Sequence, residues 1–218
     1  FWLEEELRLA EALDVVDTLV IAFLVQLIPA LALTPSLRRV RIARSDWKLI
    51  VLSGFAGAAL GPILYFYGLE RTTASNSVLL SNSESLFTML FAYAFLGERA
   101  TRREYLALGG IAVGAFFVTT QLRFGDVEFL RFLTGNVMLV AAAACWGIGN
   151  TASTVMVRRI PIISLIAIQL LLGAGFLLPI VVLTGASFDI PLHVLPLLVL
   201  LALGAVVMFS ILFFYAFR

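Results

Sequence analysis

The chain has 218 residues, of which 61% are hydrophobic and only 13% are charged, and its mean hydropathy is +1.05. Soluble domains usually carry about 25% charged residues and no more than about half apolar ones, so this composition excludes an ordinary soluble domain. The formal net charge of +1 gives no general attraction to nucleic acid, and we expect no nucleic-acid partner.

Seven apolar runs follow one another along the chain, and they are uncharged apart from Glu84 in the third. Each is long enough to cross a bilayer core of about 30 Å as a helix of about 20 residues. Barrel strands would be near 10 residues long and strictly alternating, so the pattern predicts an all-α, multi-pass membrane protein. The runs are Thr18–Leu37, Leu49–Leu69, Thr72–Gly97, Tyr105–Leu122, Phe132–Val157, Ile160–Phe188 and Ile190–Phe217.

The basic residues outside these runs are distributed unequally between the two sides of the membrane. If each run crosses once, one side carries Arg38, Arg39, Arg41, Arg44, Lys48, Arg99, Arg102, Arg103, Arg158, Arg159 and Arg218. The other side carries Arg8, Arg71, Arg123 and Arg131. Short loops rich in Lys and Arg stay in the cytoplasm. The first set therefore marks the cytoplasmic side of a cell membrane.

Two pairs of segments suggest an internal repeat. "ILYFYGLER" (63–71) is similar to "ILFFYAFR" (211–218), and "LALTPS" (31–36) is similar to "VVLTGAS" (181–187). The first run thus matches the sixth, and the second matches the seventh. Because the members of each pair are an odd number of runs apart, five, the two units enter the membrane in opposite orientations. Inverted repeats of this kind are typical of secondary transporters.

Glu84 is the one charged residue in the middle of a run. At 100° per residue, Ser77, Ser81, Glu84 and Thr88 lie within about 60° of one another on a helix. An acid at the centre of a bilayer costs about 2.5–3.5 kcal/mol on insertion scales, so it should face the protein interior or water. These residues form either the polar wall of a transport pathway, with Glu84 exchanging a proton, or a contact in which a neutral Glu84 bonds a neighbouring helix.

Residues 77–118, "SVLLSNSESLFTMLFAYAFLGERATRREYLALGGIAVGAFFV", resemble the EamA repeat of the drug/metabolite transporter superfamily. In that repeat, Leu-Gly-Glu-Arg follows a membrane glutamate by fourteen residues, and Glu84 and Glu98 keep this spacing. "ACWGIGN" (144–150) is similar to the Trp-Gly region in the first helix of a repeat. This chain departs from the family pattern at Ser85, where the family usually has proline.

The resemblance implies a bundle of ten helices built as a five-plus-five inverted repeat, of which this chain holds seven. Residues 1–122 would form helices 2–5 of the first repeat, without helix 1. Residues 130–218 would form helices 6–8 of the second, without helices 9 and 10. The chain begins at Phe1 without Met and ends at Arg218 directly after a run, so we expect a piece of a longer protein.

Several further residues are candidates for the pathway or for helix ends. Trp146 and Asn150 share a helix face, and Asn150 either lines the pathway or bonds another helix. Tyr65 and Tyr67 are either interfacial belt residues or part of a gate. Gly97 and Glu98 end the third run beside basic residues, which favours a structural role for both.

The sequence therefore predicts a secondary transporter that moves a small metabolite or drug across the cell membrane by alternating access, with proton coupling through Glu84. Its partners would be a small-molecule substrate, protons and membrane lipid, and a homodimer is left open. A receptor, a scaffold or an intramembrane enzyme is the alternative. One acid and scattered hydroxyls are too few for an enzyme site. We expect no metal, because His193 is the only histidine, and no cofactor, because no nucleotide-binding loop is present.

Overall fold

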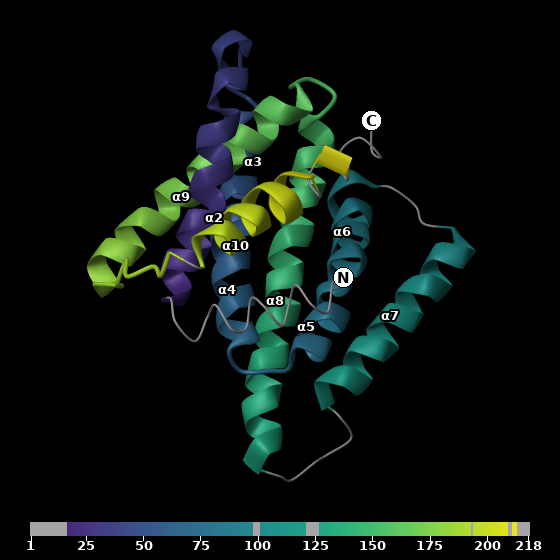
Figure 1. The fold of residues 1–218 in the computed structure, drawn as a ribbon. Helices are drawn as coiled ribbons and strands as arrows, with labels where there is room; N and C mark the ends of the chain where they lie inside the picture. The colour runs from purple at the N-terminus through teal and green to yellow at the C-terminus, as the bar shows by residue number, and fades with distance from the viewer. Residues whose placement is uncertain (1–16, 98–100, 121–126, 193, 209–210, 213–218) are drawn as a thin grey trace.

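The structure of the chain is a computed structural model, and it describes residues 17–97, 101–120, 127–192, 194–208 and 211–212. Every regular element in these residues is helical, as Figure 1 shows. The elements are α2 (Thr18–Leu33), η1 (Thr34–Arg39), α3 (Trp47–Ser53), η2 (Gly54–Leu60), α4 (Gly61–Leu69), α5 (Ala74–Ser81), α6 (Ser83–Phe91), η3 (Ala92–Leu96), α7 (Arg102–Thr120), α8 (Val127–Met156), α9 (Ile162–Thr184), α10 (Leu195–Leu200) and η4 (Leu201–Met208).

Among the described residues, five helical stretches are long and apolar enough to cross a membrane, and they correspond to the first, second, third, fifth and sixth predicted runs. The stretches are Thr18–Arg38, Trp47–Leu69, Ala74–Leu96, Phe132–Met156 and Ile162–Thr184. The fourth run forms α7, whose first turn holds two arginines and a glutamate. The seventh run begins as the shorter apolar helix Leu195–Gly204, and its end lies outside the described residues.

The second span changes its helical geometry where proline interrupts it. Pro62 has no N–H to donate to the carbonyl four residues earlier. The preceding segment, η2, is π-helical, and the Gly61 N–H donates to the Ala56 carbonyl five residues back. A π-helical turn widens the helix locally and changes which side chains face its neighbours. α3, η2 and α4 thus form a single span with a bulge at its centre.

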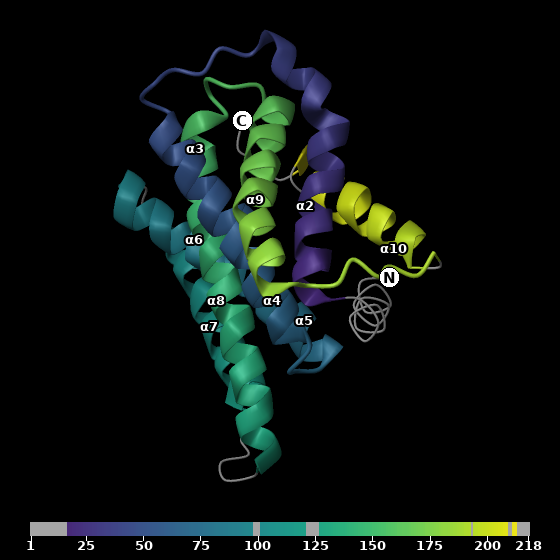
Figure 2. The same cartoon turned by 90° about the vertical axis from the view of Figure 1, so that its left-hand side faces the viewer.

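The buried core has two parts along the antiparallel pair α2 and α9, seen side by side in Figures 1 and 2. At one end, residues of α2, α4, α9 and α10 pack together, including Val20, Ile21, Phe66, Leu177 and Leu198. At the other end, residues of α3, α8 and α9 pack with the end of α2. α8 contacts α3 and α4 of the second span and also α5 and α6 of the third, so it lies between these two spans.

The loops after α2 and α8, two of the predicted cytoplasmic segments, lie at one end of the bundle, the upper end of Figure 1. Two long-range contacts join them there. Arg159 Nη1 lies 3.2 Å from Asp46 Oδ1, and the Ser164 hydroxyl donates to the Ser36 carbonyl at 3.1 Å. The loop after α2 and the loop after α8 therefore meet on the same side, as the alternation of basic residues predicts.

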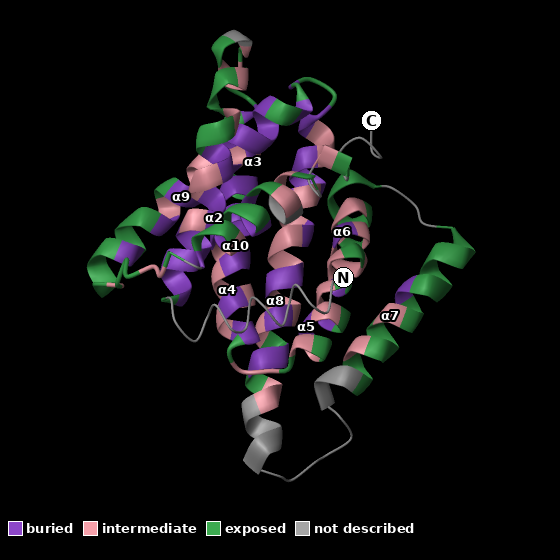
Figure 3. Cartoon of the chain, in the orientation of Figure 1, coloured by how far each residue is buried: buried purple, intermediate pink, exposed green. Residues whose placement is uncertain are grey.

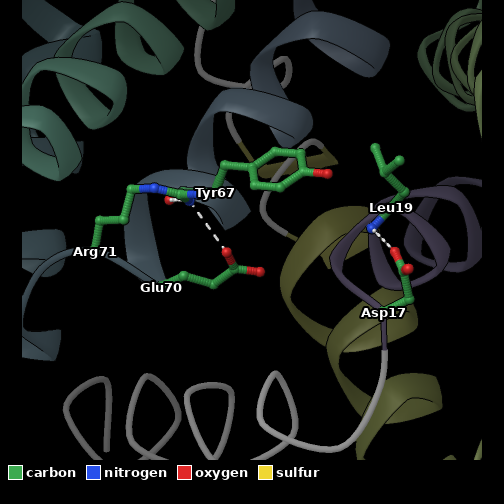
Figure 4. Close-up of polar contacts among 5 residues, drawn as sticks. All are labelled: Asp17, Leu19, Tyr67, Glu70 and Arg71. Carbon is green, nitrogen blue, oxygen red and sulfur yellow. Dashed lines mark hydrogen bonds and ion pairs between the residues drawn. The ribbon is translucent and has the colours of Figure 1, made fainter. Parts of the chain in front are cut away.

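The opposite end carries the start of α2 and the end of α4, which Figure 4 shows together. Asp17 caps α2 by accepting a hydrogen bond from the Leu19 N–H at 2.9 Å. Arg71 Nη1 lies 3.1 Å from Glu70 Oε2, and Arg71 Cζ lies over the Tyr67 ring, 5.4 Å from its centroid. Partial burial raises the pKa of the Glu70 carboxyl above its ordinary value, and neighbouring Arg71 opposes this shift.

α7 lies at the edge of the bundle beside α5, α6 and α8, and most of its surface is exposed (Figure 3). It begins with a capping box, in which the Thr101 N–H donates to the Glu104 carboxylate and the Glu104 N–H donates to the Thr101 hydroxyl. The bond from the Thr101 N–H lowers the pKa of Glu104. A Cβ added at Gly110 or Gly114 would meet nothing within 4 Å.

Candidate functional site

Glu84 and Asn150 are in direct contact between α6 and α8. The Asn150 amide Nδ2 donates a hydrogen bond to Glu84 Oε1 at 2.5 Å. Glu84 lies in the first turn of α6, and Asn150 lies two turns before the end of α8. Both are partly buried. The sequence named both residues as candidates, and the structure brings them together as a polar pair inside an apolar bundle.

A close crossing of α6 and α8 holds this pair in place. A Cβ added at Gly147 would lie 2.9 Å from the backbone nitrogen of Thr88, so only glycine fits there without displacing α6. One turn further along α8, the Thr151 hydroxyl contacts the Thr88 carbonyl at 3.2 Å and its own helix at Gly147. Small residues let helix backbones approach closely in membranes. The backbone spacing therefore allows the short Asn150 side chain to reach Glu84.

The helix that carries Glu84 is interrupted just before it. α5 ends at Ser81 and α6 begins at Ser83, with Asn82 in a turn between them. The Asn82 side chain donates to the Val78 carbonyl at 2.9 Å, and the Ser85 N–H reaches only to the Asn82 carbonyl. The break therefore occurs although Ser85 stands where the family usually has proline.

The other hydroxyl residues of the predicted polar stripe are mostly turned toward protein. Ser77 and Thr88 are buried, and Ser81 is partly buried. The Ser81 hydroxyl donates to the Ser77 carbonyl at 2.8 Å, within its own helix. The Thr88 hydroxyl is buried without a hydrogen-bond partner among the described residues. A role for these hydroxyls in a pathway stays a prediction.

The aromatic candidates divide into two places. Trp146 lies one turn before Asn150 on α8, and its ring packs against Tyr65 of α4 with centroids 5.3 Å apart. Trp146 also contacts α4 closely, because a Cβ at Gly61 would lie 2.7 Å from its Nε1. Tyr67 instead lies at the end of the span under Arg71. Trp146, with Tyr65 packed against it, thus lies one turn from Asn150, whereas Tyr67 belongs to the helix end.

Of the two predicted helix-end residues, only Gly97 can be placed. It follows the π-helical segment η3 with φ +68°, a left-handed conformation that glycine adopts without strain. Glu98 lies outside the described residues.

Two amides that were not candidates from the sequence, the partly buried Gln169 and the buried Asn136, bridge further helices. Gln169 of α9 donates to the hydroxyls of Ser53 and Ser153 at 2.8 and 2.6 Å, which joins α3, α8 and α9. Asn136 of α8 is fully buried, and its Oδ1 accepts a bond from the Thr72 hydroxyl. The signal that could have found them is an amide side chain inside an apolar run, because a polar group in the membrane needs a hydrogen-bond partner.

The Glu84–Asn150 pair can form a hydrogen bond in either charge state of the carboxyl group. No group of three or more His, Cys, Asp or Glu side chains that could hold a metal ion occurs among the described residues. The Glu84 carboxyl can accept hydrogen bonds when ionised and donate one when protonated. Asn150 offers both a donor and an acceptor to meet either form.

The sequence model of the EamA-like transporter family matches residues 7–120 and 133–218. The chain belongs to this family. Membership confirms the predicted all-α, multi-pass membrane fold, and this is a transporter family and not an enzyme family. Glu84 lies in the first matched stretch and Asn150 in the second, so their hydrogen bond joins the two.

Several curated relatives from bacteria and archaea are similar to this EamA-like chain. An uncharacterized transporter of Methanothermobacter thermautotrophicus is 30% identical over 156 residues, which cover 72% of this chain and 46% of the relative. A transporter of Archaeoglobus fulgidus, also uncharacterized, is 25% identical and covers 65% and 48% of the two chains. The pseudopaline exporter CntI of Pseudomonas aeruginosa is 26% identical over 87 residues, which cover 40% and 30%. The chain thus spans less than half the length of these relatives.

A solved crystal structure shares the fold. It superposes with a TM-score of 0.70 and covers 99% of this chain and 75% of the other, at 21% sequence identity. This similarity extends over nearly the whole of this chain and concerns the fold alone.

Proposed function

We propose that this chain is part of a secondary transporter that moves a small metabolite or drug by alternating access, with Glu84 and Asn150 at the polar centre. The observation that carries the proposal is their hydrogen bond at 2.5 Å, which connects the two stretches matched by the family. In inverted-repeat transporters, substrate sites lie near the middle of the membrane where the repeats meet. A pair at this place breaks or changes when one repeat moves against the other.

The two repeats would be residues 1–122 and 130–218, each completed by helices of the longer protein. α2 and α9, which correspond to the matched first and sixth runs, run in opposite directions (Figure 1). This opposition supports an inverted repeat. Rocking of one repeat against the other would open the Glu84 region first to one side of the membrane and then to the other.

Proton coupling follows from the change in the Glu84–Asn150 bond with charge. A hydrogen bond to an ionised carboxylate is about twice as strong as one between neutral groups. When Glu84 takes up a proton from water, its bond with Asn150 weakens, and the contact between the repeats weakens with it. A proton that binds one arrangement better than the other shifts the population of the two. Protonation of Glu84 would thereby favour the repeats' separation.

The substrate class is a small metabolite or drug. The similarity to the pseudopaline exporter, though limited to 87 residues, supports export as the first direction to test. Trp146 lies one helical turn before Asn150 on α8, and its ring packs against Tyr65 of α4, so these two rings would offer an apolar surface close to Asn150. A substrate with both a polar group and an apolar or aromatic part would use both features.

The test is transport by the full-length protein in proteoliposomes with an imposed pH gradient, using labelled amino acids, sugars and the fluorescent cation ethidium as substrates. We expect the Glu84→Gln variant to fold normally and to lose flux driven by the gradient. Ser85→Ala is the matched control, because Ser85 is the exposed neighbour on the same helix. Gradient-driven flux by Glu84→Gln equal to that of Ser85→Ala would remove Glu84 from the mechanism.

A further inference from the structure

The segment that leads into α3 presents basic charge at the surface. Residues 38–48 contain five basic residues and one acid, Asp46. The Asp46 side chain is only 8% exposed and pairs with Arg159, so it neutralises a residue from another loop. The basic side chains of the segment that are exposed are Arg38, Arg41, Arg44 and Lys48.

Directly after this basic segment, α3 and η2 present an exposed apolar face. Trp47, Val51 and Phe55 are spaced one turn apart and are 43%, 42% and 48% exposed. The Phe55 ring is fixed by an edge contact with Phe176 of α9, with centroids 5.4 Å apart. From Lys48 to Phe55 the helix rises about 10 Å, a distance that lies within one leaflet of a bilayer core of about 30 Å.

We propose that Arg44 and Lys48 bind the headgroup of an anionic phospholipid, whose acyl chain lies along Val51 and Phe55. A phosphate oxygen accepts charge-assisted hydrogen bonds from guanidinium and ammonium groups. Trp47 lies at the junction of the basic and apolar parts, the depth at which tryptophan is enriched in membrane proteins. Clusters of basic residues beside a membrane helix attract anionic lipid, and the apolar face directly beneath them gives this lipid a defined position.

The Asp46–Arg159 ion pair holds the proposed headgroup site in a fixed position in the bundle. Because Asp46 immediately precedes α3, its contact with Arg159 fixes the start of this helix against the end of α8. Arg44 and Lys48 flank Asp46 at two residues on either side. The headgroup site therefore has its position set by the bundle, and it does not depend on the proposed transport mechanism.

The experiment titrates the full-length protein in detergent with phosphatidylglycerol or phosphatidylcholine and counts bound lipid by native mass spectrometry. The Arg44→Gln/Lys48→Gln variant is compared with Arg102→Gln/Arg103→Gln, which removes two exposed basic residues from another predicted cytoplasmic segment. We expect phosphatidylglycerol affinity to fall at least about tenfold in the first variant and less than about twofold in the second.

Two results would overturn the proposal. One is an equal loss in both variants, which would indicate attraction by general surface charge. The other is a wild-type protein that binds phosphatidylglycerol no better than phosphatidylcholine. The wild-type comparison, repeated as a thermal shift with each lipid, does not require any variant to fold. Greater stabilisation by phosphatidylglycerol is the expected outcome.

Discussion

Gly147 of α8 lies so close to α6 that a Cβ at this position would be 2.7 Å from the Cβ of Phe87. No larger residue fits without moving one of the helices. Asn150 follows three residues later and donates to Glu84 across the same crossing. The absence of a side chain at Gly147 therefore sets the distance over which the polar pair forms.

Gly147→Ala should separate α6 from α8 and weaken the Glu84–Asn150 contact. Inserting a methyl group into a tightly packed interface typically costs about 1–3 kcal/mol. We expect a lower melting temperature of the full-length protein in detergent and a loss of transport. Gly114→Ala is the control, because its Cβ would meet nothing within 4 Å. Equal melting temperatures of the two variants would contradict this account of the crossing.

The hydrogen bond between Glu84 and Asn150 should appear as an energetic coupling. We expect Glu84→Ala and Asn150→Ala each to lower stability, and the double variant to lower it by less than their sum. Hydrogen bonds between membrane helices are worth about 0.6–2 kcal/mol, and the coupling should lie in this range. The measurement is a double-mutant cycle on unfolding in mixed detergent. Strictly additive effects would show that the two side chains do not interact in the membrane.

Much of the fold and part of the candidate site could be predicted from the sequence. The length and apolarity of the runs predicted five spans that the structure contains, and the isolated charge of Glu84 marked the centre of the site. Asn150 was a candidate because an amide in a membrane helix needs a partner. That its partner is Glu84 could not be predicted, since this depends on how α6 and α8 are rotated about their crossing at Gly147.

Other features were missed because they depend on contacts between distant residues. Gln169 and Asn136 are amides within apolar runs, as Asn150 is, but the helices that they join depend on how the bundle packs. The π-helical bulge before Pro62 changes which side chains of α3 and α4 face the neighbouring helices. A regular step of 100° per residue, as in an ideal helix, does not predict this change. The break at Asn82 likewise occurs without a proline.

Asn136→Ala should destabilise the protein more than Gln169→Leu. Asn136 is fully buried and accepts a hydrogen bond from Thr72, so its loss leaves that hydroxyl without this partner at a cost of about 1–3 kcal/mol. The hydroxyls that accept from Gln169 also donate to backbone carbonyls of their own helices, and these bonds survive the substitution. Thermal unfolding of both variants measures the difference. A larger loss for Gln169→Leu would reverse the ranking.

The predicted orientation can be tested by single-cysteine labelling in a background where Cys145 and any other cysteines of the full-length protein are replaced. Cysteines at Ser45 and Thr101, both exposed in predicted cytoplasmic segments, should react only with reagent on the cytoplasmic side. A cysteine at the exposed Ser187, beyond the other end of α9, should react only from outside. Reaction of Ser45 and Ser187 from the same side would overturn the topology.

The central claim is that Glu84 gains and loses a proton during transport. The most direct measurement is pH-difference infrared spectroscopy of the full-length protein in lipid, which detects the C=O band of a protonated carboxyl group. The account predicts a carboxylic acid band in the wild type that changes with pH and on addition of substrate and is missing from Glu84→Gln. Identical difference spectra of the wild type and the variant would contradict it.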